Sequence, residues 1–567
     1  MGPLIPESSH YTESGVAPGS LVGIGYRAGN GSSGRRGGVG GVHEVEVVVL
    51  LVALATVVAV FAKHLRVPAP SLLVVAGLLV GLLPEAPPVH VPPDIVSLVV
   101  LPPLLYAASE ELSWRDLRAV WRPVAVLAVG LVLASAAAVA AVGAAVASLS
   151  LSMAFVLGAI LASTDPVAVG ALARRLSLPV RVQTVVQAES LFNDGTSLVL
   201  FQIAVSLAVG GTAAMTAAGA VLHGAGEFII LAGGGALTGA AVAAGVIVMR
   251  RRITDPVLET VTALLTPYVA YLLGETLHVS GVTAVIVAGL AIGARRSKIT
   301  TAQTRLQLHS VYQTIIFVLE AVVFALIGLE LPTLVRDLGH AGTWPVAALA
   351  VTATLIATRV AWVFPVFAIS GRRQSTRRPS WPVAAVVSWA GTRGVVPLAA
   401  ALSIPLTTAD GSALPQRDLV LVLAATTIVI SLIVQGFTLE PLARLAGFGP
   451  AAAGPVHEET LARLRMAEAG LARLEELAEN GAAPDEVIDR LRAGLQARIG
   501  TTRARMAPGP DASGTAQTER ELRGDLISAE TAELSRLYDA GTISAATRGR
   551  LQRNLDLETA RLTEGKQ

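Results

Sequence analysis

The chain has 567 residues, of which 53% are hydrophobic and only 15% are charged, and its mean hydropathy is +0.63. An ordinary soluble domain carries about 25% charged residues, so this composition indicates a polytopic membrane protein built from helices. The formal net charge of +2 argues against a nucleic-acid partner, and the absence of cysteine excludes disulfides, thiolate zinc sites and cysteine nucleophiles.

Residues 1–42 are rich in glycine and serine, as in the run "GNGSSGRRGGVGG", and show no periodic apolar pattern. We therefore expect a disordered N-terminal tail without a secretory signal. An alternative is that translation begins near Val42, because "VHEVEVVVLLVAL" resembles a mature start and a valine codon can initiate in genomes rich in G and C.

Apolar segments recur from residue 45 to residue 445, with lengths that suit about 30 Å of hydrocarbon if some helices are broken. This pattern predicts about thirteen membrane spans in an all-α membrane domain over residues 43–447. The predicted spans are 45–62, 69–83, 94–108, 123–147, 151–173, 182–208, 226–249, 256–274, 280–294, 309–331, 345–369, 382–402 and 418–442.

The charge of the connecting loops alternates, as expected when cytoplasmic loops collect lysine and arginine. Basic loops include "KHLR", "WRDLRAVWR", "RRSK" and "GRRQSTRR", whereas the loops between them, such as "PEAPPVHVPPD" and "SLSLS", carry almost no positive charge. We therefore expect the N-terminus outside, the chain after residue 445 in the cytoplasm, and the plasma membrane as the location.

The composition changes after residue 455, and leucines then recur at helical spacing among glutamate and arginine: Leu461, Leu464, Leu471 and Leu474. This pattern predicts a cytoplasmic helical tail over residues 455–567. Helix-stop and helix-start residues divide it into two hairpins joined by the linker "APGPDASGTAQ" at 507–517. We interpret the tail as a packing or dimerisation module, with a regulatory sensor as the alternative, and it holds no motif typical of catalysis or nucleotide binding.

Four charged side chains lie inside segments that otherwise resemble hydrocarbon-soluble helix: Asp165, Glu189, Asp194 and Arg393. Each lies about seven to twelve residues from the cytoplasmic end of its span, which at about 1.5 Å per residue places all four near the middle of the membrane. A charge at that depth costs at least ~2.5 to 3.5 kcal/mol, so such residues face a partner or an ion path. We therefore expect the four side chains to meet.

A further pair of intramembrane charges lies on the tenth and eleventh predicted spans. Glu320, in "FVLEAVVFALIGLELP", and Arg359 come from depths that differ by only ~4.5 Å. We hypothesise a structural ion pair between Glu320 and Arg359.

Two of the charge-bearing segments contain helix-breaking residues. "LASTDPVAV" (161–169) places Pro166 after Asp165, and "SWAGTRGVVPLAA" (388–400) surrounds Arg393 with glycines and a proline. Both helices are expected to unwind at mid-depth, where freed backbone groups can line a cavity. Interrupted helices in corresponding places of two halves are typical of transporters built from inverted repeats, and here spans five and twelve correspond.

Five motifs in the right order resemble the monovalent cation:proton antiporters of the sodium/proton exchanger (NhaP-like) family. They are "LPPLLYAAS" (101–109), "STDPVAV" (163–169), "ESLFNDGTSLVL" (189–200), "GETLHVSGVTAVIVAGLAIG" (274–293) and "WAGTRGVVPLAAAL" (389–402). The resemblance implies an electroneutral exchanger, normally a homodimer, in which a core domain with two crossed broken helices moves relative to a dimerisation domain.

The resemblance also assigns a cation and proton site. Asp194 is expected to be the carboxylate that binds either the cation or a proton, with Asn193 beside it. Ser190 is expected to supply a hydroxyl oxygen, Thr164 a backbone carbonyl or hydroxyl oxygen, and Asp165 a direct or indirect carboxylate. The transported sodium would contact Asp194, Ser190 and Thr164, whose oxygen atoms suit a small hard cation.

Two further expectations come from the same motifs. Glu189 is expected to pair with Arg393 and brace the crossing of the broken helices. Many relatives carry a carboxylate directly after the aromatic residue of the third-span motif, but this chain has Ala107 after Tyr106. We therefore do not count on an extra acidic ligand or water anchor from that helix.

The leading hypothesis is secondary exchange of sodium, or lithium in its place, for protons across the plasma membrane, one for one. Potassium/proton exchange is the alternative, because potassium takes the same ligand types. An intramembrane aspartyl protease using Asp165 and Asp194 is a remote rival, since it has no use for Arg393 or Ser190. A channel would need uncompensated polar rings, which the sequence does not show. We expect no cofactor, and we expect the lipid bilayer and a second copy of the chain as partners.

Overall fold

The computed structural model describes residues 50–58, 60–61, 69–83, 92–165, 180–210, 217–253, 255–300, 302–338, 342–372, 381–446, 454–506 and 511–540, and scattered residues between 542 and 559. Residues 1–50 and 51–567 form separate units, and every element below belongs to the second. The predicted tail 1–42 lies outside the described residues. Where the chain is described, regular structure is helical apart from one isolated bridge between Thr407 and Ala413.

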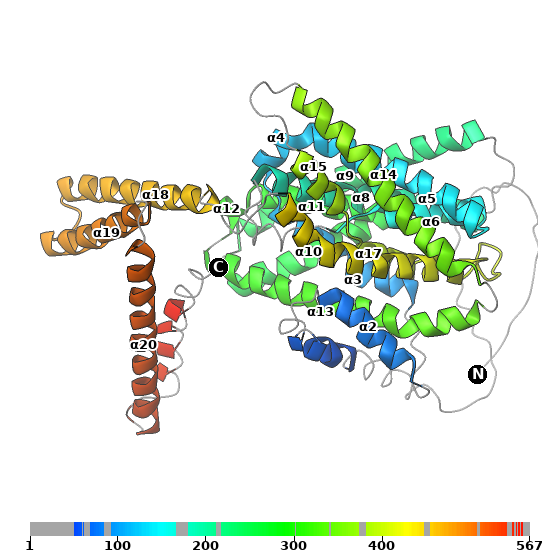
Figure 1. The fold of residues 1–567 in the computed structure, drawn as a ribbon. Helices are drawn as coiled ribbons and strands as arrows, with labels where there is room; N and C mark the ends of the chain where they lie inside the picture. Colours follow the sequence, from blue (N-terminus) through cyan, green and yellow to red (C-terminus); the bar gives the residue numbers. More distant parts are fainter. Residues whose placement is uncertain are drawn as a thin grey trace, which may run out of the picture. The chain divides into compact units, whose positions relative to one another are not determined.

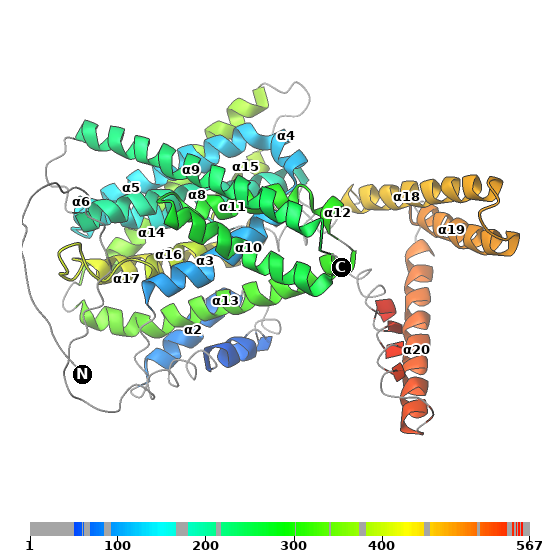
Figure 2. The same cartoon turned by 180° about the vertical axis from the view of Figure 1, so that it is seen from behind.

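The helices follow the chain in a simple order (Figures 1 and 2). Those before residue 251 are α2 (Ala69–Gly81), α3 (Pro93–Glu111), α4 (Trp114–Ala125), η1 (Val126–Leu131), α5 (Val132–Val146), α6 (Leu151–Ala162), α8 (Val180–Gly210) and α9 (Ala217–Arg250). The next are α10 (Pro256–Thr276), α11 (Gly281–Gly293), α12 (Arg296–Ile299), α13 (Ala302–Asp337), α14 (Trp344–Arg372), α15 (Trp381–Trp389), α16 (Val395–Leu402) and α17 (Arg417–Leu445). The last are α18 (Gly454–Glu479), α19 (Asp485–Met506) and α20 (Asp511–Asp539).

Seven described helical stretches are long and apolar enough to cross a membrane: Trp114–Val146, Val182–Gly210, Gly224–Arg250, Pro256–Thr276, Thr304–Arg336, Trp344–Phe367 and Arg417–Leu445. They coincide with the fourth, sixth, seventh, eighth, tenth, eleventh and thirteenth predicted spans. Shorter apolar helices coincide with the second, fifth and ninth. The chain is therefore a multi-pass membrane protein, and the count of about thirteen spans stays a prediction.

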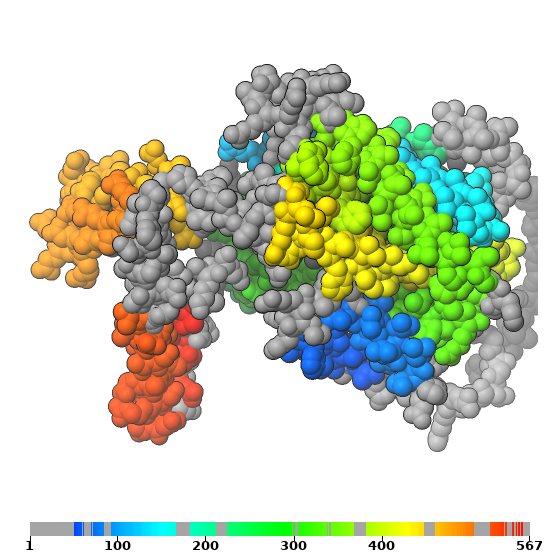
Figure 3. All heavy atoms as spheres, in the orientation of Figure 1, coloured from blue at the N-terminus to red at the C-terminus, as the bar shows by residue number. Residues whose placement is uncertain are grey.

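The surface of these helices carries many large apolar side chains. Figure 3 shows one face on which α2 (blue), α14 (green) and α17 (yellow) are exposed. On these helices Leu79, Leu349 and Phe437 are among the exposed residues. Lipid chains solvate such a surface as readily as the protein interior does, so this exposure is expected of a membrane-embedded protein.

The fourth span is longer at its start than the sequence indicates. The segment "WRDLRAVWR", taken above as a loop because of its charges, forms helix α4, and the Oγ of Ser113 caps it by accepting a bond from the Asp116 amide (3.4 Å). Leu117 and Val120 are buried while Arg115, Arg118 and Arg122 are exposed, so the segment is an amphipathic helix. The helix continues through the π-helical turn η1 into α5.

Close helix contacts depend on glycine. α2 packs along α13 (Figure 1). A Cβ added at Gly77 would meet the backbone carbonyl of Ala325, and one at Gly328 would meet the carbonyl of Val74. Small residues that let two backbones approach are the usual means of helix association in membranes.

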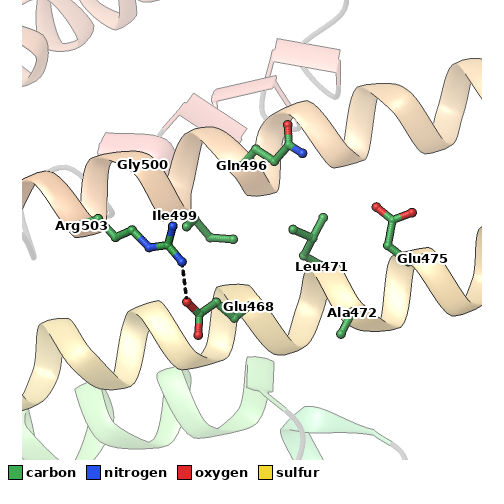
Figure 4. Close-up of a pocket in the computed structure, with 8 residues that line it drawn as sticks. All are labelled: Glu468, Leu471, Ala472, Glu475, Gln496, Ile499, Gly500 and Arg503. Carbon is green, nitrogen blue, oxygen red and sulfur yellow. Dashed lines mark hydrogen bonds and ion pairs between the residues drawn. The ribbon is translucent and has the colours of Figure 1, made fainter.

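The first part of the tail is an antiparallel helical hairpin of α18 and α19. Leu464, Ala467 and Ile499 form its buried apolar cluster, with Leu471 packed against them. Figure 4 shows Leu471 and Ile499 between the two helices, beside a groove of about 560 Å³. The predicted stop at Asn480-Gly481 is confirmed, since α18 ends at Glu479 and Gly481 has a φ of +63°.

The linker between the tail hairpins is shorter than predicted. Helix α20 already begins at Asp511, inside the stretch 507–517 taken above as linker. After the two prolines of that stretch only one glycine opposes helix formation, and an aspartate in the first turn favours it.

Candidate functional site

The central ionic contact of the membrane domain joins Glu189 of α8 to Arg359 of α14. The Arg359 Nη1 lies 2.6 Å from Glu189 Oε1, and Nη2 lies 3.2 Å from Oε2. The two side chains are only 3% and 1% exposed. Arg359 also donates through Nε to the carbonyl of Ser388 (3.1 Å) and through Nη2 to that of Val387 (3.2 Å), so this guanidinium is well satisfied.

Both ion pairs expected from the sequence are therefore wrong, because Glu189 does not pair with Arg393 and Arg359 does not pair with Glu320. Counting residues fixes the depth of a side chain but not the direction in which it leaves its helix. Arg359 reaches the centre because Gly391 leaves room for it, since a Cβ on Gly391 would collide with the Arg359 side chain.

Arg393 is buried, at 3% exposure, and has no carboxylate within ion-pair distance in the described part of the chain. Its Nη1 donates to the carbonyl of Gly391 (2.9 Å), and its Nε has no hydrogen-bond partner among the described residues. It lines one small cavity together with Glu189, Arg359 and Asn193. Of the four charges expected to meet, Glu189 and Arg393 thus lie at one cavity, and Arg359 takes the place expected for Arg393 beside Glu189.

Asp194 lies on the next turn of α8 and accepts a hydrogen bond from the Oγ of Ser163 at its Oδ1. It is 8% exposed and, unlike Glu189, has no ion pair with any described residue. Ser163 was not among the predicted site residues. Its place directly before Thr164, in the segment expected to unwind, is the signal that would have found it.

Thr164 is the meeting point of the other predicted residues. The Nδ2 of Asn193 donates to Thr164 Oγ1 (2.6 Å), and the hydroxyl of Ser190 donates to the Thr164 carbonyl. Asn193 is 2% exposed, and its Oδ1 accepts no hydrogen bond from the described residues. A buried acceptor oxygen without a donor is unusual and is the kind of atom that a bare cation coordinates.

The two interrupted segments meet through their backbones. The chain leaves α6 at Ala162 and stays non-helical to Asp165, and the break between α15 and α16 spans residues 390–394. The Asp165 amide donates to the Thr392 carbonyl (2.8 Å), and the Thr392 hydroxyl donates to the Asp165 carbonyl (3.2 Å). Gly394 is required here, because a Cβ at this position would collide with the Asp165 carboxyl group.

The rest of the predicted fifth span, residues 166–179, lies outside the described residues. The predicted break around Arg393 is confirmed, and Thr392 is a further site residue that sequence reasoning missed. Its side chain and its carbonyl both join the two segments.

The third-span motif packs elsewhere. Tyr106 of α3 is fully buried and stacks on Tyr312 of α13, with 5.8 Å between ring centroids. Its hydroxyl has no hydrogen-bond partner among the described residues. Ala107 is buried and brings no oxygen to the group around Asp194.

The side chains gathered around Asp194 and Thr164 offer oxygen atoms as donors to a cation. Asp194 supplies a carboxylate, Asn193 an amide oxygen, Thr164 a hydroxyl and a carbonyl, and Ser163 and Ser190 hydroxyls. This donor set fits a hard monovalent cation and not a soft transition metal. The same carboxylate can hold a proton in place of the cation.

The chain is similar to several known proteins. A family model described as "Sodium/hydrogen exchanger, transmembrane" matches residues 49–445. A protein of Mycobacterium tuberculosis (strain ATCC 25618 / H37Rv) described as an uncharacterized Na⁺/H⁺ exchanger is 35% identical over 527 residues, which cover 90% of this chain and 94% of that protein. The Na⁺/H⁺ antiporter ApNhaP of Aphanothece halophytica is 30% identical over 72% of this chain and 75% of its own length.

Two further similarities concern ion range and fold. A sodium, potassium, lithium and rubidium/H⁺ antiporter of Bacillus pumilus is 31% identical over 66% of this chain and 57% of its own length. The sodium proton antiporter MjNhaP1 of Methanocaldococcus jannaschii, solved at pH 8, shares the fold at a TM-score of 0.58 and 21% identity, covering 72% of this chain and 99% of that one. The chain therefore belongs to the sodium/hydrogen exchanger family, as an NhaP-like cation:proton antiporter and a transporter rather than an enzyme.

Proposed function

We propose that the protein exchanges sodium, or lithium in its place, for protons across the plasma membrane, one ion for one proton, by alternating access. The observation that carries this proposal is the contrast between two acids one turn apart on α8. Glu189 is held by Arg359 in a buried ion pair, whereas Asp194 has hydroxyl and amide neighbours and no ion-pair partner among the described residues. Only Asp194 is free to exchange one cation for another.

The charge balance supports the ratio of one to one. Glu189 and Arg359 cancel, and near Asp194 in the described part of the chain the charges of Asp165 and Arg393 are opposite in sign. The site then carries one uncompensated negative charge when empty and none when it holds a sodium ion or a proton. Crossing a low-dielectric barrier empty would cost several kcal/mol, so return without cargo is suppressed.

Sodium is placed before potassium in this proposal because the family description and the relative ApNhaP both name sodium. The Asn193–Thr164, Ser190–Thr164 and Ser163–Asp194 hydrogen bonds gather the oxygens that would bind it. The broader range named for the Bacillus pumilus relative makes potassium the competitor to test.

The finer architecture belongs to the same proposal. It has about thirteen spans in two inverted repeats, with spans five and twelve as crossed broken helices, the N-terminus outside, a cytoplasmic helical domain over residues 455–567, and a homodimer as the working unit. The fold shared with MjNhaP1 and the interrupted segments that meet at Asp165 and Thr392 support it.

The test is ion-driven proton flux in vesicles containing the purified protein. Sodium, lithium and potassium are supplied in parallel, and the luminal pH is followed with a dye. We expect sodium and lithium to release protons and potassium to do so weakly. Because sodium and protons share Asp194, the apparent sodium affinity should fall as pH drops, and an affinity that is constant from pH 6 to 9 would contradict the shared site.

A further inference from the structure

A second cavity, of about 1120 Å³, lies between α4, η1, α8 and α11, apart from the oxygen ligands around Asp194. Its walls are mostly apolar, and Leu117, Ile286 and Leu290 are among the residues that line them. Trp114 and Trp121 of α4 line it as well, and both are more than half exposed, at 55% and 56%. Exposed tryptophans near the end of a membrane span are typical of the interface between hydrocarbon and lipid headgroups.

The charged residues that line this cavity all have the same sign. Arg118, Arg251 and Arg295 face it, and no aspartate or glutamate does among its lining residues. In the described part of the chain no ion pair joins any of the three to an acidic side chain. Three like charges around an apolar hollow repel one another unless an anion lies between them.

The combination of these features selects the anion. Inorganic phosphate would satisfy the arginines but would leave the apolar walls and the tryptophans without contacts. A phospholipid with an acidic headgroup satisfies both, and basic pockets between membrane helices are known to hold such headgroups. We propose that this cavity binds an anionic phospholipid, with its phosphate among Arg118, Arg251 and Arg295 and an acyl chain along the apolar walls.

The position of the cavity gives the lipid a role in transport, and this step rests on the proposed function. Phe192 and Thr196 line the cavity, and these two residues bracket Asn193 and Asp194 on α8. Three unneutralised arginines beside that turn would oppose the approach of a cation to the site. A bound lipid phosphate offsets them, so its loss should lower the apparent affinity for sodium.

The binding test does not depend on transport. The purified full-length protein is incubated with phosphatidylglycerol or phosphatidylcholine, and bound lipid is counted by native mass spectrometry. We expect phosphatidylglycerol to bind preferentially, and excess inorganic phosphate to displace it only weakly. Equal binding of the two lipids, or full displacement by phosphate, would overturn the proposal.

A matched pair of variants locates the site. The triple variant Arg118→Gln, Arg251→Gln and Arg295→Gln should lower phosphatidylglycerol affinity by at least about tenfold, since one basic residue near the lipid contributes about fivefold. The control triple variant Arg115→Gln, Arg122→Gln and Arg252→Gln removes the same charge from exposed positions that do not line the cavity. An equal loss of phosphatidylglycerol affinity in both variants would show a general attraction of the lipid to the basic surface and would contradict binding in this cavity.

A third variant guards against misfolding of the charge variants. Ala291→Phe fills the apolar part of the cavity and keeps every arginine. This variant should also lower lipid binding, and normal binding in a folded Ala291→Phe protein would contradict the proposed position of the acyl chain.

In vesicles of fixed lipid composition, the cavity triple variant should raise the sodium concentration needed for half-maximal flux several-fold relative to the control. Preferential lipid binding with unchanged sodium dependence would separate the site from transport, and absent exchange in the wild type would refute the proposed function alone.

Discussion

Two ion pairs of nearly the same geometry lie in very different surroundings. In the membrane domain Arg359 binds both oxygens of Glu189, at 2.6 and 3.2 Å, and in the tail hairpin Arg492 binds both oxygens of Glu475, at 2.8 Å each. The first pair is 3% and 1% exposed, and the second is 30% and 44% exposed. The comparison teaches that geometry alone does not set how much stability is lost when one member of an ion pair is removed.

The difference comes from the state that replaces the pair when one member is lost. A tail glutamate without its arginine is hydrated by water at little cost. A glutamate in the membrane interior without its arginine keeps a charge that nothing solvates, which is strongly destabilising. By the same reasoning, we expect Asp194, which is buried without an ion pair among the described residues, to depend on a mobile ion.

The largest expected effect tests that last statement. Asp194→Asn keeps the shape of the side chain but removes the titratable ligand, so proton release driven by sodium should fall to the level of empty vesicles. Thermal unfolding should remain close to that of the wild type, because no ion pair to a described residue is lost. Asp116→Asn, which changes an exposed acid on α4, is the matched control and should exchange normally. Exchange that survives in folded Asp194→Asn protein would remove the core of the proposal.

The second effect separates the two buried arginines. Arg359→Ala strands Glu189 and should lower the free energy of unfolding by about 3 to 5 kcal/mol. Arg393→Ala loses one bond to the Gly391 carbonyl and should cost about 1 to 3 kcal/mol. Unfolding of the detergent-solubilised proteins, followed by intrinsic fluorescence, measures both. If the Arg393→Ala protein were the less stable of the two, Arg393 and not Arg359 would be the main partner of Glu189.

A smaller effect is expected from the tail as a whole. Removal of residues 455–567 leaves every proposed ligand in place, so sodium-driven proton flux should be reduced at most and not abolished. The amount of folded protein in the vesicles is measured alongside the flux. Complete loss of flux from a folded truncated protein would make the tail part of the transport mechanism.

The smallest effect concerns the exposed pair. In this pair, the hydrogen bond that Arg492 donates to Glu475 holds the pKa of the Glu475 carboxyl group below the ordinary value of about 4.3. A depressed pKa in the folded state contributes stability that is present above the ordinary value and is lost as pH falls through the folded value. Amide hydrogen exchange in α18 and α19 of the full chain should therefore rise slightly below about pH 4. Glu475→Gln should abolish this increment, and an identical acid response in that variant would exclude Glu475 as its source.

The sequence was sufficient to predict the break around Arg393 and the proximity of some intramembrane charges, but not the direction in which each side chain points. Counting along the spans placed Glu189, Asp194 and Arg393 at one level, and the structure brings Glu189 and Arg393 to one cavity. The choice between Arg359 and Arg393 as the partner of Glu189 depends on side-chain direction and on the space left by Gly391. Neither quantity can be read from the spacing of residues in one chain.

Two errors have a different cause, since local composition was given too much weight. The segment that forms α4 was predicted to be a loop because of its charges, although Leu117 and Val120, which are buried, already have helical spacing. Ser163 and Thr392 carry no charge and have no assigned role in the family motifs, so neither signal predicts them. Each of them directly precedes a residue of the predicted site or break, so every residue of an unwound segment is a candidate site residue.

The reciprocal contact between Asp165 and Thr392 makes part of the site indifferent to side-chain identity. The amide of residue 165 and the carbonyl of residue 392 are present whatever side chains stand there, so most substitutions leave this bond available. Proline at position 165 is the exception, because it has no amide hydrogen. A catalogue of tolerated substitutions would therefore understate how firmly the two interrupted segments are joined, since what links them is the polypeptide itself.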